Sequence, residues 1–282
     1  MIIERKKTAM KRIKEENSSY AEYMLYHQFN PNKAYSFIDK EEYIDEITPE
    51  NLYLEYKNMI EESEVSLVIC GDVEDDYIEK TILSHIKHNK KYNLDILINN
   101  DDEKLKYVDK EIQGVGSQGV LTVVSYLRHI DNYELHYVLP LYRIILGGGT
   151  NSRLFEKIRE EKSLAYYSFA RLEKDDNMLM AIMGIENKNY KQTLKLVHKI
   201  MKSMRIITKE ELEDAKKTLI TNLMESEDSL NGVISRKSTA IMYNLPEPKT
   251  FIKKIESVSI KDVEKVANKI NPDFSFYVKA GK

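Results

Sequence analysis

Three consecutive glycines at residues 147–149 interrupt a helical pattern, and this corner constrains the fold more than any other feature of the 282-residue chain. Residues 132–146 before it favour a helix, and the Thr-Asn-Ser at residues 150–152 after it can cap the start of a second one. Glycine adopts positive φ at little cost, which is a common reason for its presence where a helix ends. The sequence therefore predicts two helices joined by a corner whose glycines have positive φ.

The segments around this corner predict an α+β domain over residues 107–282. Two β-prone runs joined by a short Asp-Asp-Asn turn follow the second helix, which indicates an antiparallel hairpin. We expect strands at residues 119–127, 165–173, 178–186 and 274–279, and helices at residues 132–146, 152–162, 189–204, 208–223 and from 260 onward. This order predicts helices packed on a mostly antiparallel sheet.

The first part of the chain echoes the end of that domain. Thr48 and Pro49 open a predicted helix that precedes a predicted buried strand at residues 65–70. Ser259 opens the last helix in the same way, ahead of the strand at residues 274–279. A two-fold repeat of one α+β unit would produce this echo. The complete domain is therefore predicted to follow the rear half of a second similar domain.

This interpretation divides the chain into three parts. Residues 1–88 are a truncated first α+β domain, residues 89–106 a polar linker, and residues 107–282 the complete domain. Within the first part we also expect one helix over residues 4–29 and another over residues 74–88.

Charge and composition exclude several classes of function. The 43 basic and 46 acidic residues give a net charge of -3, and no segment has the basic excess typical of nucleic-acid binding. Apolar runs are much shorter than the ~20 residues that span a bilayer, and the N-terminus does not resemble a signal peptide. The single cysteine, Cys70, excludes an internal disulfide. We therefore expect a soluble cytoplasmic protein that binds neither nucleic acid nor membrane.

No short motif indicates a metal site, a nucleophile or a phosphate loop. His85 and His88 are the only closely spaced histidines, and the lysines beside them would repel a dication. Cys70 lies in an apolar run, where a core role is most common. The glycine corner lacks the Gly-Lys-Ser/Thr of a phosphate loop, and a helix precedes it where a dinucleotide site needs a strand.

A longer motif extends from the glycine corner into the hairpin. Residues 146–170 read LGGGTNSRLFEKIREEKSLAYYSFA. This segment closely resembles the C-terminal domain motif of the insulinase/pitrilysin family of zinc peptidases, the inverzincins. In that family Leu-Gly-Gly-Gly-x-x-Ser-x-Leu-Phe precedes an Arg-Glu-Lys-x-Leu-(Ala/Gly)-Tyr segment. Residues 46–52, 69–72, 118–119, 184–186 and 207–212 also resemble the family, so the resemblance extends over most of the chain.

The resemblance implies that Arg159 and Tyr166 are site residues, because in this family an Arg and a Tyr seven residues later reach the metal-bound substrate. A phenolic O–H can donate to a developing oxyanion, and a guanidinium can hold a peptide carbonyl or carboxylate. Tyr167 is the equivalent tyrosine if the register shifts by one residue. Peptide contacts are also expected from the corner, at Gly147, Gly148, Gly149, Thr150, Asn151 and Ser152.

The zinc site that the resemblance implies is missing from this chain. The family's catalytic half carries HxxEH on a helix and a downstream Glu as third ligand. This sequence has no HxxEH, and Lys11 or Arg12, depending on register, stands where the third ligand would be. Neither side chain binds zinc at neutral pH. We therefore expect no cofactor on this chain and zinc in a partner subunit.

The resemblance thus implies a subunit that is inactive alone. Bacterial members of the family often work as pairs, in which one subunit holds the zinc and the other supplies the Arg and the Tyr. We expect the chain to bind a peptide substrate and to assist an HxxEH-bearing partner, or to self-associate. Two alternatives remain, which are a structural or binding homologue without a peptidase role and a truncated gene product.

Overall fold

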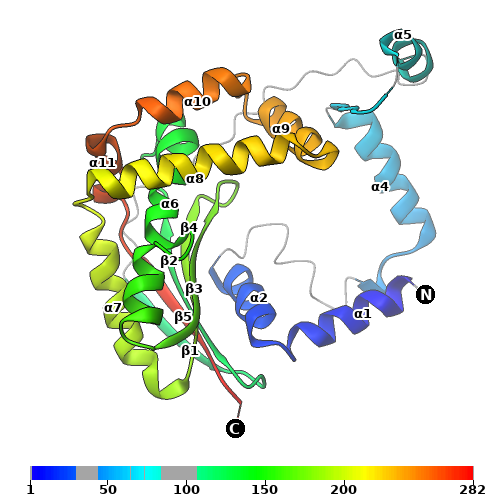
Figure 1. Cartoon of the computed structure of the whole chain (residues 1–282). Helices are drawn as coiled ribbons and strands as arrows, with labels where there is room; N and C mark the ends of the chain where they lie inside the picture. The colour runs from blue at the N-terminus through cyan, green and yellow to red at the C-terminus, as the bar shows by residue number, and fades with distance from the viewer. Residues whose placement is uncertain (1, 30–43, 64, 73, 84–106, 282) are drawn as a thin grey trace. The chain divides into compact units, whose positions relative to one another are not determined.

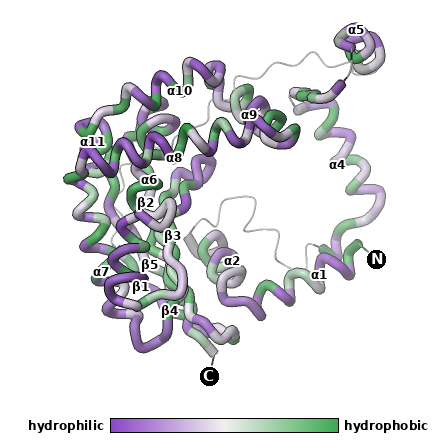
Figure 2. The backbone as a smooth tube through the Cα atoms, in the orientation of Figure 1, coloured by the Kyte–Doolittle hydropathy of each residue, from purple (hydrophilic) through white to green (hydrophobic). Residues whose placement is uncertain are grey.

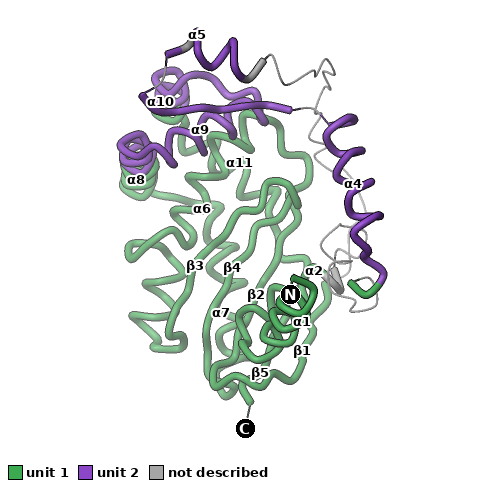
Figure 3. Tube along the Cα trace, turned by 90° about the vertical axis from the view of Figure 1, so that its right-hand side faces the viewer, with its two compact units in different colours: residues 1–45, 98–219, 255–282 green, residues 46–97, 220–254 purple. Residues whose placement is uncertain are grey.

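The computed structural model describes residues 2–29, 44–63, 65–72, 74–83 and 107–281. The chain forms two compact units. Unit 1 comprises residues 1–45, 98–219 and 255–282, and unit 2 comprises residues 46–97 and 220–254 (Figure 3). The predicted linker at residues 89–106 lies outside the described residues. None of the described helices combines the length and the apolar character that crossing a bilayer requires.

Unit 1 is built on a five-stranded mixed sheet with the strand order β1-β5-β2-β4-β3. The strands are β1 (Val108–Gln113), β2 (Gly119–Tyr126), β3 (Ala165–Glu173), β4 (Met178–Ile185) and β5 (Phe274–Lys279). Strands β1 and β5 run parallel, and every other neighbouring pair is antiparallel. The predicted α+β class is confirmed, as are the four predicted strands of this unit.

Helices cover both faces of this sheet. Unit 1 contains α1 (Ile2–Ile13), α2 (Asn17–Phe29), η3 (Glu134–Val138), α6 (Leu139–Gly147), η4 (Phe155–Glu160), η5 (Asn187–Asn189), α7 (Tyr190–Ser203) and α11 (Ile260–Lys269). Helices α6, α7 and α11 lie on one face, and α2 lies on the other (Figure 1). Two further helices, α8 (Lys209–Glu227) and α10 (Pro248–Ser257), have residues in both units.

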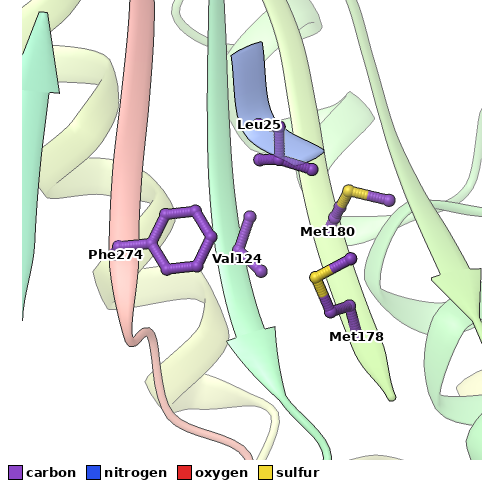
Figure 4. Packing of buried hydrophobic residues seen from close by; sticks show 5 residues of the cluster. All are labelled: Leu25, Val124, Met178, Met180 and Phe274. Carbon is purple, nitrogen blue, oxygen red and sulfur yellow. The ribbon is translucent and has the colours of Figure 1, made fainter. Parts of the chain in front are cut away.

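Alternation along the strands sorts their side chains onto these two faces. Leu121 and Tyr277 lie on the face of α6 and α7, where the Tyr277 ring stacks on Tyr190 with centroids 4.3 Å apart. On the other face, Leu25 of α2 is 2% exposed and packs into a cluster of residues from three strands: Val124, Met178, Met180 and Phe274 (Figure 4). Figure 2 accordingly shows hydrophobic stretches along α6 and the central strands.

The single helix predicted over residues 4–29 is two helices, α1 and α2. Asn17, at the start of α2, is 4% exposed. Its side-chain oxygen accepts from the N–H of Gly116, and its NH₂ group donates to the carbonyls of Gly116, Gln118 and Lys279. These bonds anchor the start of α2 to the β1–β2 turn and to the end of β5. The helical pattern is interrupted here because Asn17 makes tertiary contacts.

Strand β1 is missing from the predicted elements. Its sequence, Val-Asp-Lys-Glu-Ile-Gln, contains only two apolar residues, and it lies at an edge of the sheet with most of its side chains exposed. Its pairing with β5 is supported by side-chain bonds, since both Tyr190 and Ser275 donate to the Asp109 carboxylate. Partners from α7 and β5 thus stabilise a strand whose own sequence has little β character.

Unit 2 contains α4 (Pro49–Glu62), α5 (Asp75–Ile78), η2 (Glu79–Leu83) and α9 (Leu230–Met242). The predicted cap of α4 is confirmed, because Thr48 and Asn51 form reciprocal capping bonds, as Ser259 and Asp262 do at the start of α11. No residue of α4 is buried, although it carries a stripe of large apolar side chains. The helix predicted over residues 74–88 is confirmed as far as Leu83, and its remainder lies outside the described residues.

The buried strand predicted at residues 65–70 is wrong. The segment forms no strand, and Val65, Leu67 and Ile69 are 47%, 55% and 41% exposed. Its counterpart β5 pairs with β1 on one side and with β2 on the other. Residues 65–70 have no such neighbour among the described residues, and a strand cannot form without one. Two similar local patterns therefore have different structures because only one of them has partner strands.

We predict that Leu25→Ala lowers the free energy of unfolding by about 2–5 kcal/mol, the cost of a cavity in a packed core. The matched variant Leu230→Ala on α9, where Leu230 is 61% exposed, should change it by less than about 0.5 kcal/mol. Urea unfolding followed by circular dichroism measures both. Equal losses from the two variants would show that α2 is not packed on the sheet.

Candidate functional site

The glycine corner is set by a close approach between α6 and β3. A Cβ atom on Gly147 would lie 2.4 Å from the backbone N of Ala170 and 2.8 Å from the carbonyl carbon of Phe169. No side chain fits there, so α6 can rest directly on the β3 backbone. The expectation of positive φ is wrong, because Gly148 has a φ of -94° and no described glycine has a positive φ. Space, and not backbone conformation, requires glycine at position 147.

The polar residues after the glycines divide into a buried and an exposed group. Ser152 is 2% exposed, and its hydroxyl donates to the carbonyl of Gly149 at 2.6 Å. This bond closes the turn. Thr150 and Asn151 are exposed, and a Cβ on Gly149 would meet no atom within 4 Å. A peptide can therefore reach residues 149–151, and their role in binding stays a prediction.

Arg153 connects the glycine corner to residues 207–212, another segment that resembles the family. Its guanidinium forms a two-pronged pair with Glu211, with Nε–Oε1 at 2.6 Å and Nη2–Oε2 at 2.8 Å, and it also donates to Ser203 and to the carbonyl of Ile206. Glu211 in turn caps α8 by accepting from the N–H of Thr208. Burial alone would raise the pKa of Glu211, but these bonds outweigh it and lower the pKa. No role was predicted for Arg153 from the sequence, and in the structure it ties the glycine corner to the start of α8.

Arg159 lies on η4 and is only weakly engaged. Its side chain is 46% exposed, its Nε is 3.7 Å from Glu160, and its guanidinium carbon lies 4.8 Å from the centre of the Phe155 ring. An exposed ion pair at this distance contributes little to stability. The guanidinium therefore remains able to bind a carboxylate or carbonyl from outside the chain.

Tyr166 stands at the beginning of β3, where the pairing with β4 is irregular. Its ring is 57% exposed, and its hydroxyl donates to the Glu186 carboxylate at 3.1 Å. This bond, together with the negative charge of Glu186, raises the pKa of Tyr166. Glu186 also pairs with Lys188 at 2.6 Å, and the bonds from Lys188 and Tyr166 lower its pKa. The tyrosine therefore keeps its proton at neutral pH and can act as a donor. No hydrogen bond joins Tyr166 to Arg159 in this structure.

A cleft of about 790 Å³ lies between α2 and the sheet, and no pattern in the sequence predicted it. Its floor includes Tyr167 and Phe169 of β3, and one wall is α2. None of the predicted site residues lines it, but Tyr167, the alternative to Tyr166, does. The Tyr167 ring lies over Gly184, where a Cβ would be 2.3 Å from the ring. The cleft forms because α2 packs on the sheet. No local sequence motif could therefore have predicted it.

Arg171 lies in the same cleft and is held by two carboxylates. It donates to Glu22 of α2 at 2.6 Å and also to Glu173. Burial alone would lower the pKa of the guanidinium, but these bonds raise it. On the same floor, burial and the charge of Glu16 raise the pKa of Tyr167. Arg171 is thus fully charged and already paired.

The described residues offer no group of three or more His, Cys, Asp or Glu side chains that could hold a metal ion. Lys11 and Arg12, at the position expected for a zinc ligand, are exposed on α1. His85 and His88 lie outside the described residues.

Comparison with known proteins gives a family match. A family model described as the peptidase M16 inactive domain matches residues 46–219. The chain is 26% identical over 288 aligned residues to the "Probable inactive metalloprotease YmfF" of Bacillus subtilis, covering 99% of this chain and 67% of that protein. It is 25% identical to the "Non-peptidase homolog YmxG" of Helicobacter pylori, covering 90% of this chain and 60% of that protein.

Solved structures show a similar fold. A crystal structure of a conserved protein from Enterococcus faecalis superposes with a TM-score of 0.83 at 20% identity, covering 99% of this chain and 67% of that chain. The chain thus spans 60–67% of the length of these three proteins.

We predict that Gly147→Ala lowers the free energy of unfolding by about 1–3 kcal/mol, because the new methyl group must push α6 away from the β3 backbone. Gly149→Ala, two residues on in open space, is the matched control and should change it by less than about 1 kcal/mol. Urea titration of both variants measures the difference. Equal effects would contradict the close approach.

Proposed function

This chain belongs to the peptidase M16 family through its inactive domain, and we propose that it is a zinc-free subunit that assists a zinc-bearing partner. In this proposal it binds an extended peptide and supplies Arg159 and Tyr166 to the partner's active site. Its relatives from B. subtilis and H. pylori are described as inactive and as a non-peptidase. A role that needs no zinc site on this chain agrees with both descriptions.

The observation that supports this role most is the exposed side chain of Tyr166, whose hydroxyl donates to Glu186. Gly147, Ser152 and Arg153 are committed to packing or to internal hydrogen bonds, whereas Arg159 and Tyr166 are exposed. Arg159 and Tyr166 therefore contribute little to the fold, and their side chains are accessible to a ligand.

The proposed chemistry is a transfer of one hydrogen bond. In the free chain Tyr166 donates to Glu186. When a peptide carbonyl gains negative charge at the partner's zinc, the tyrosine would donate to that oxygen instead, and an oxyanion is a stronger acceptor than the carbonyl it replaces. Arg159 would hold a neighbouring carbonyl or carboxylate of the peptide. Zinc, when bound by the partner, would polarise the carbonyl and activate the attacking water.

Strand β3 offers a place for the peptide. It is the last strand of the sheet, and no backbone hydrogen bond from another described element reaches it on its outer side. An extended peptide can add to such an edge through main-chain bonds, which tolerate many sequences. Tyr166 would then lie at one end of the bound segment.

We further propose that residues 1–88 are the rear half of a second similar domain, of which α1 and α2 belong to unit 1 and the part with α4 needs a partner surface. The matching capping boxes of α4 and α11 support the repeat. The stripe on α4, with Leu52, Tyr56, Met59 and Ile60 45–59% exposed, lies along one helix face, and contiguous exposed apolar side chains commonly mark an interaction surface. A partner sheet would cover α4 and pair with residues 65–70.

A second candidate is a structural or binding homologue without any role in proteolysis. The description of the H. pylori relative as a non-peptidase favours it. In that case Arg159 and Tyr166 would be surface residues, and hydrolysis by any zinc-bearing subunit would be independent of both.

Tyr166→Phe removes one donor and almost no volume, so it tests the trans-acting role. We predict that it lowers the kcat of the complex with an HxxEH-bearing subunit by roughly 10–1,000-fold with little change in KM. Arg159→Ala should raise KM as well, since a guanidinium also holds the ground-state peptide. A quenched fluorescent peptide, assayed at equal occupancy of each complex, measures both.

Tyr167→Phe is the control for these variants, because it removes the neighbouring hydroxyl and should be mild. Wild-type turnover by both Tyr166→Phe and Arg159→Ala would contradict the trans-acting role and favour the structural homologue.

For assembly, we predict a dimer or a complex with the HxxEH-bearing subunit at micromolar concentration. The double variant Tyr56→Lys/Met59→Lys places charges in the α4 stripe and should weaken association at least ~10-fold. The control is Ile241→Lys on α9, which adds one lysine outside the stripe at a residue 52% exposed. It should have little effect on association. Light scattering that finds a monomer both alone and with the subunit would contradict the proposal.

A further inference from the structure

The cleft between α2 and β3 is lined by more acidic than basic groups, and its floor is aromatic and apolar. We propose that it is a specificity pocket for basic side chains of the bound peptide. This inference rests on the proposed peptide-binding role and adds a substrate class to it, namely extended peptides with Lys or Arg at alternate positions. The family motif assigns no residue to this cleft apart from the alternative Tyr167.

The register of β3 connects the peptide to the cleft. Tyr167, Phe169 and Arg171 alternate along β3 and all line the cleft, while Ser168 and Ala170 between them point to the opposite face. A peptide strand added to the β3 edge follows the same pleat. Every second side chain of that peptide would therefore enter the cleft, and the others would point to the face of α6.

The charge of the cleft selects the kind of side chain. Glu15, Glu16 and Glu22 contribute three carboxylates to the lining, and Arg171 is the one basic side chain in it. Because Arg171 is already paired with Glu22 and Glu173, it offers little to an acidic ligand. The Glu15 carboxylate has no bonding partner among the described residues. The lining is thus complementary to a cation.

The floor fits the rest of a basic side chain. The rings of Tyr167 and Phe169 lie with centroids 6.0 Å apart, and Phe169 is 39% exposed. Ring faces attract Lys and Arg, and their methylene stems pack on apolar surface. Val120, Met180 and Ile182 provide that surface beside the rings. An ammonium or guanidinium can therefore lie over the rings while its charge faces Glu22 of α2 and the carboxylates of Glu15 and Glu16 in the turn before α2.

Fluorescence anisotropy with the whole chain tests this pocket without any zinc-bearing subunit. The probes are dye-labelled peptides of sequence Thr-Val-X-Val-X-Val-Thr, with X as Lys, Gln or Glu. We expect the Lys peptide to bind at least about ten-fold more tightly than the Glu peptide. The difference should shrink between about 50 and about 500 mM salt, since exposed charges are screened.

Two variants test whether the carboxylates of Glu15 and Glu22 bind the basic side chains of the peptide. Glu15→Gln should weaken the Lys peptide about two- to five-fold and leave the Gln peptide unchanged. Its charge-matched control is Glu210→Gln, at an exposed position of α8, which should change neither. Glu22→Gln frees Arg171 from one partner, so it should weaken the Lys peptide and strengthen the Glu peptide.

Equal binding of the Lys and Glu peptides, or no binding of either, would overturn the pocket. So would a Glu15→Gln variant that behaves like Glu210→Gln. A loss of hydrolysis in Tyr166→Phe together with no preference for the Lys peptide would leave the proposed function in place and remove the specificity pocket alone.

Discussion

The contact between Gly147 and the backbone of β3 positions all the candidate site residues of unit 1. Because Gly147 has no Cβ, α6 rests directly on the backbone of β3. The chain then turns within a few residues after α6 ends. Ser152 closes that turn, and Arg153 ties it to Glu211 at the start of α8. The chain then continues through η4 into β3. Arg159 and Tyr166 are thus carried on segments that buried contacts hold in place, although both side chains are exposed.

The docking of α2 has a comparable effect on the other face. Leu25 fills a cluster formed by β2, β4 and β5, and Asn17 donates to two carbonyls of the β1–β2 turn and to one at the end of β5. Since α2 covers β2 and β5, it leaves the floor formed by β3 and β4 open beside it. The cleft and its acidic wall are consequences of this single packing arrangement.

The sequence was sufficient for most of unit 1, because hydrophobic periodicity and caps reflect local physics. The hairpin of β3 and β4 and the capped start of α11 are cases of this kind. Tertiary contacts account for the failures. Strand β1 forms because β5, Tyr190 and Ser275 support it, and residues 65–70 do not form a strand because no described neighbour pairs with them. The cleft could not be predicted, since its walls are over 140 residues apart in sequence, as Glu22 and Arg171 are.

The most direct test of the central claim is the turnover of a quenched peptide by an HxxEH-bearing M16 subunit titrated with this chain. The account predicts that this chain alone cleaves nothing and that the subunit's kcat rises saturably as the chain is added, because the partner then gains a hydrogen-bond donor for the developing oxyanion. Unchanged turnover after light scattering has shown that the complex is formed, or cleavage by this chain alone, would contradict it.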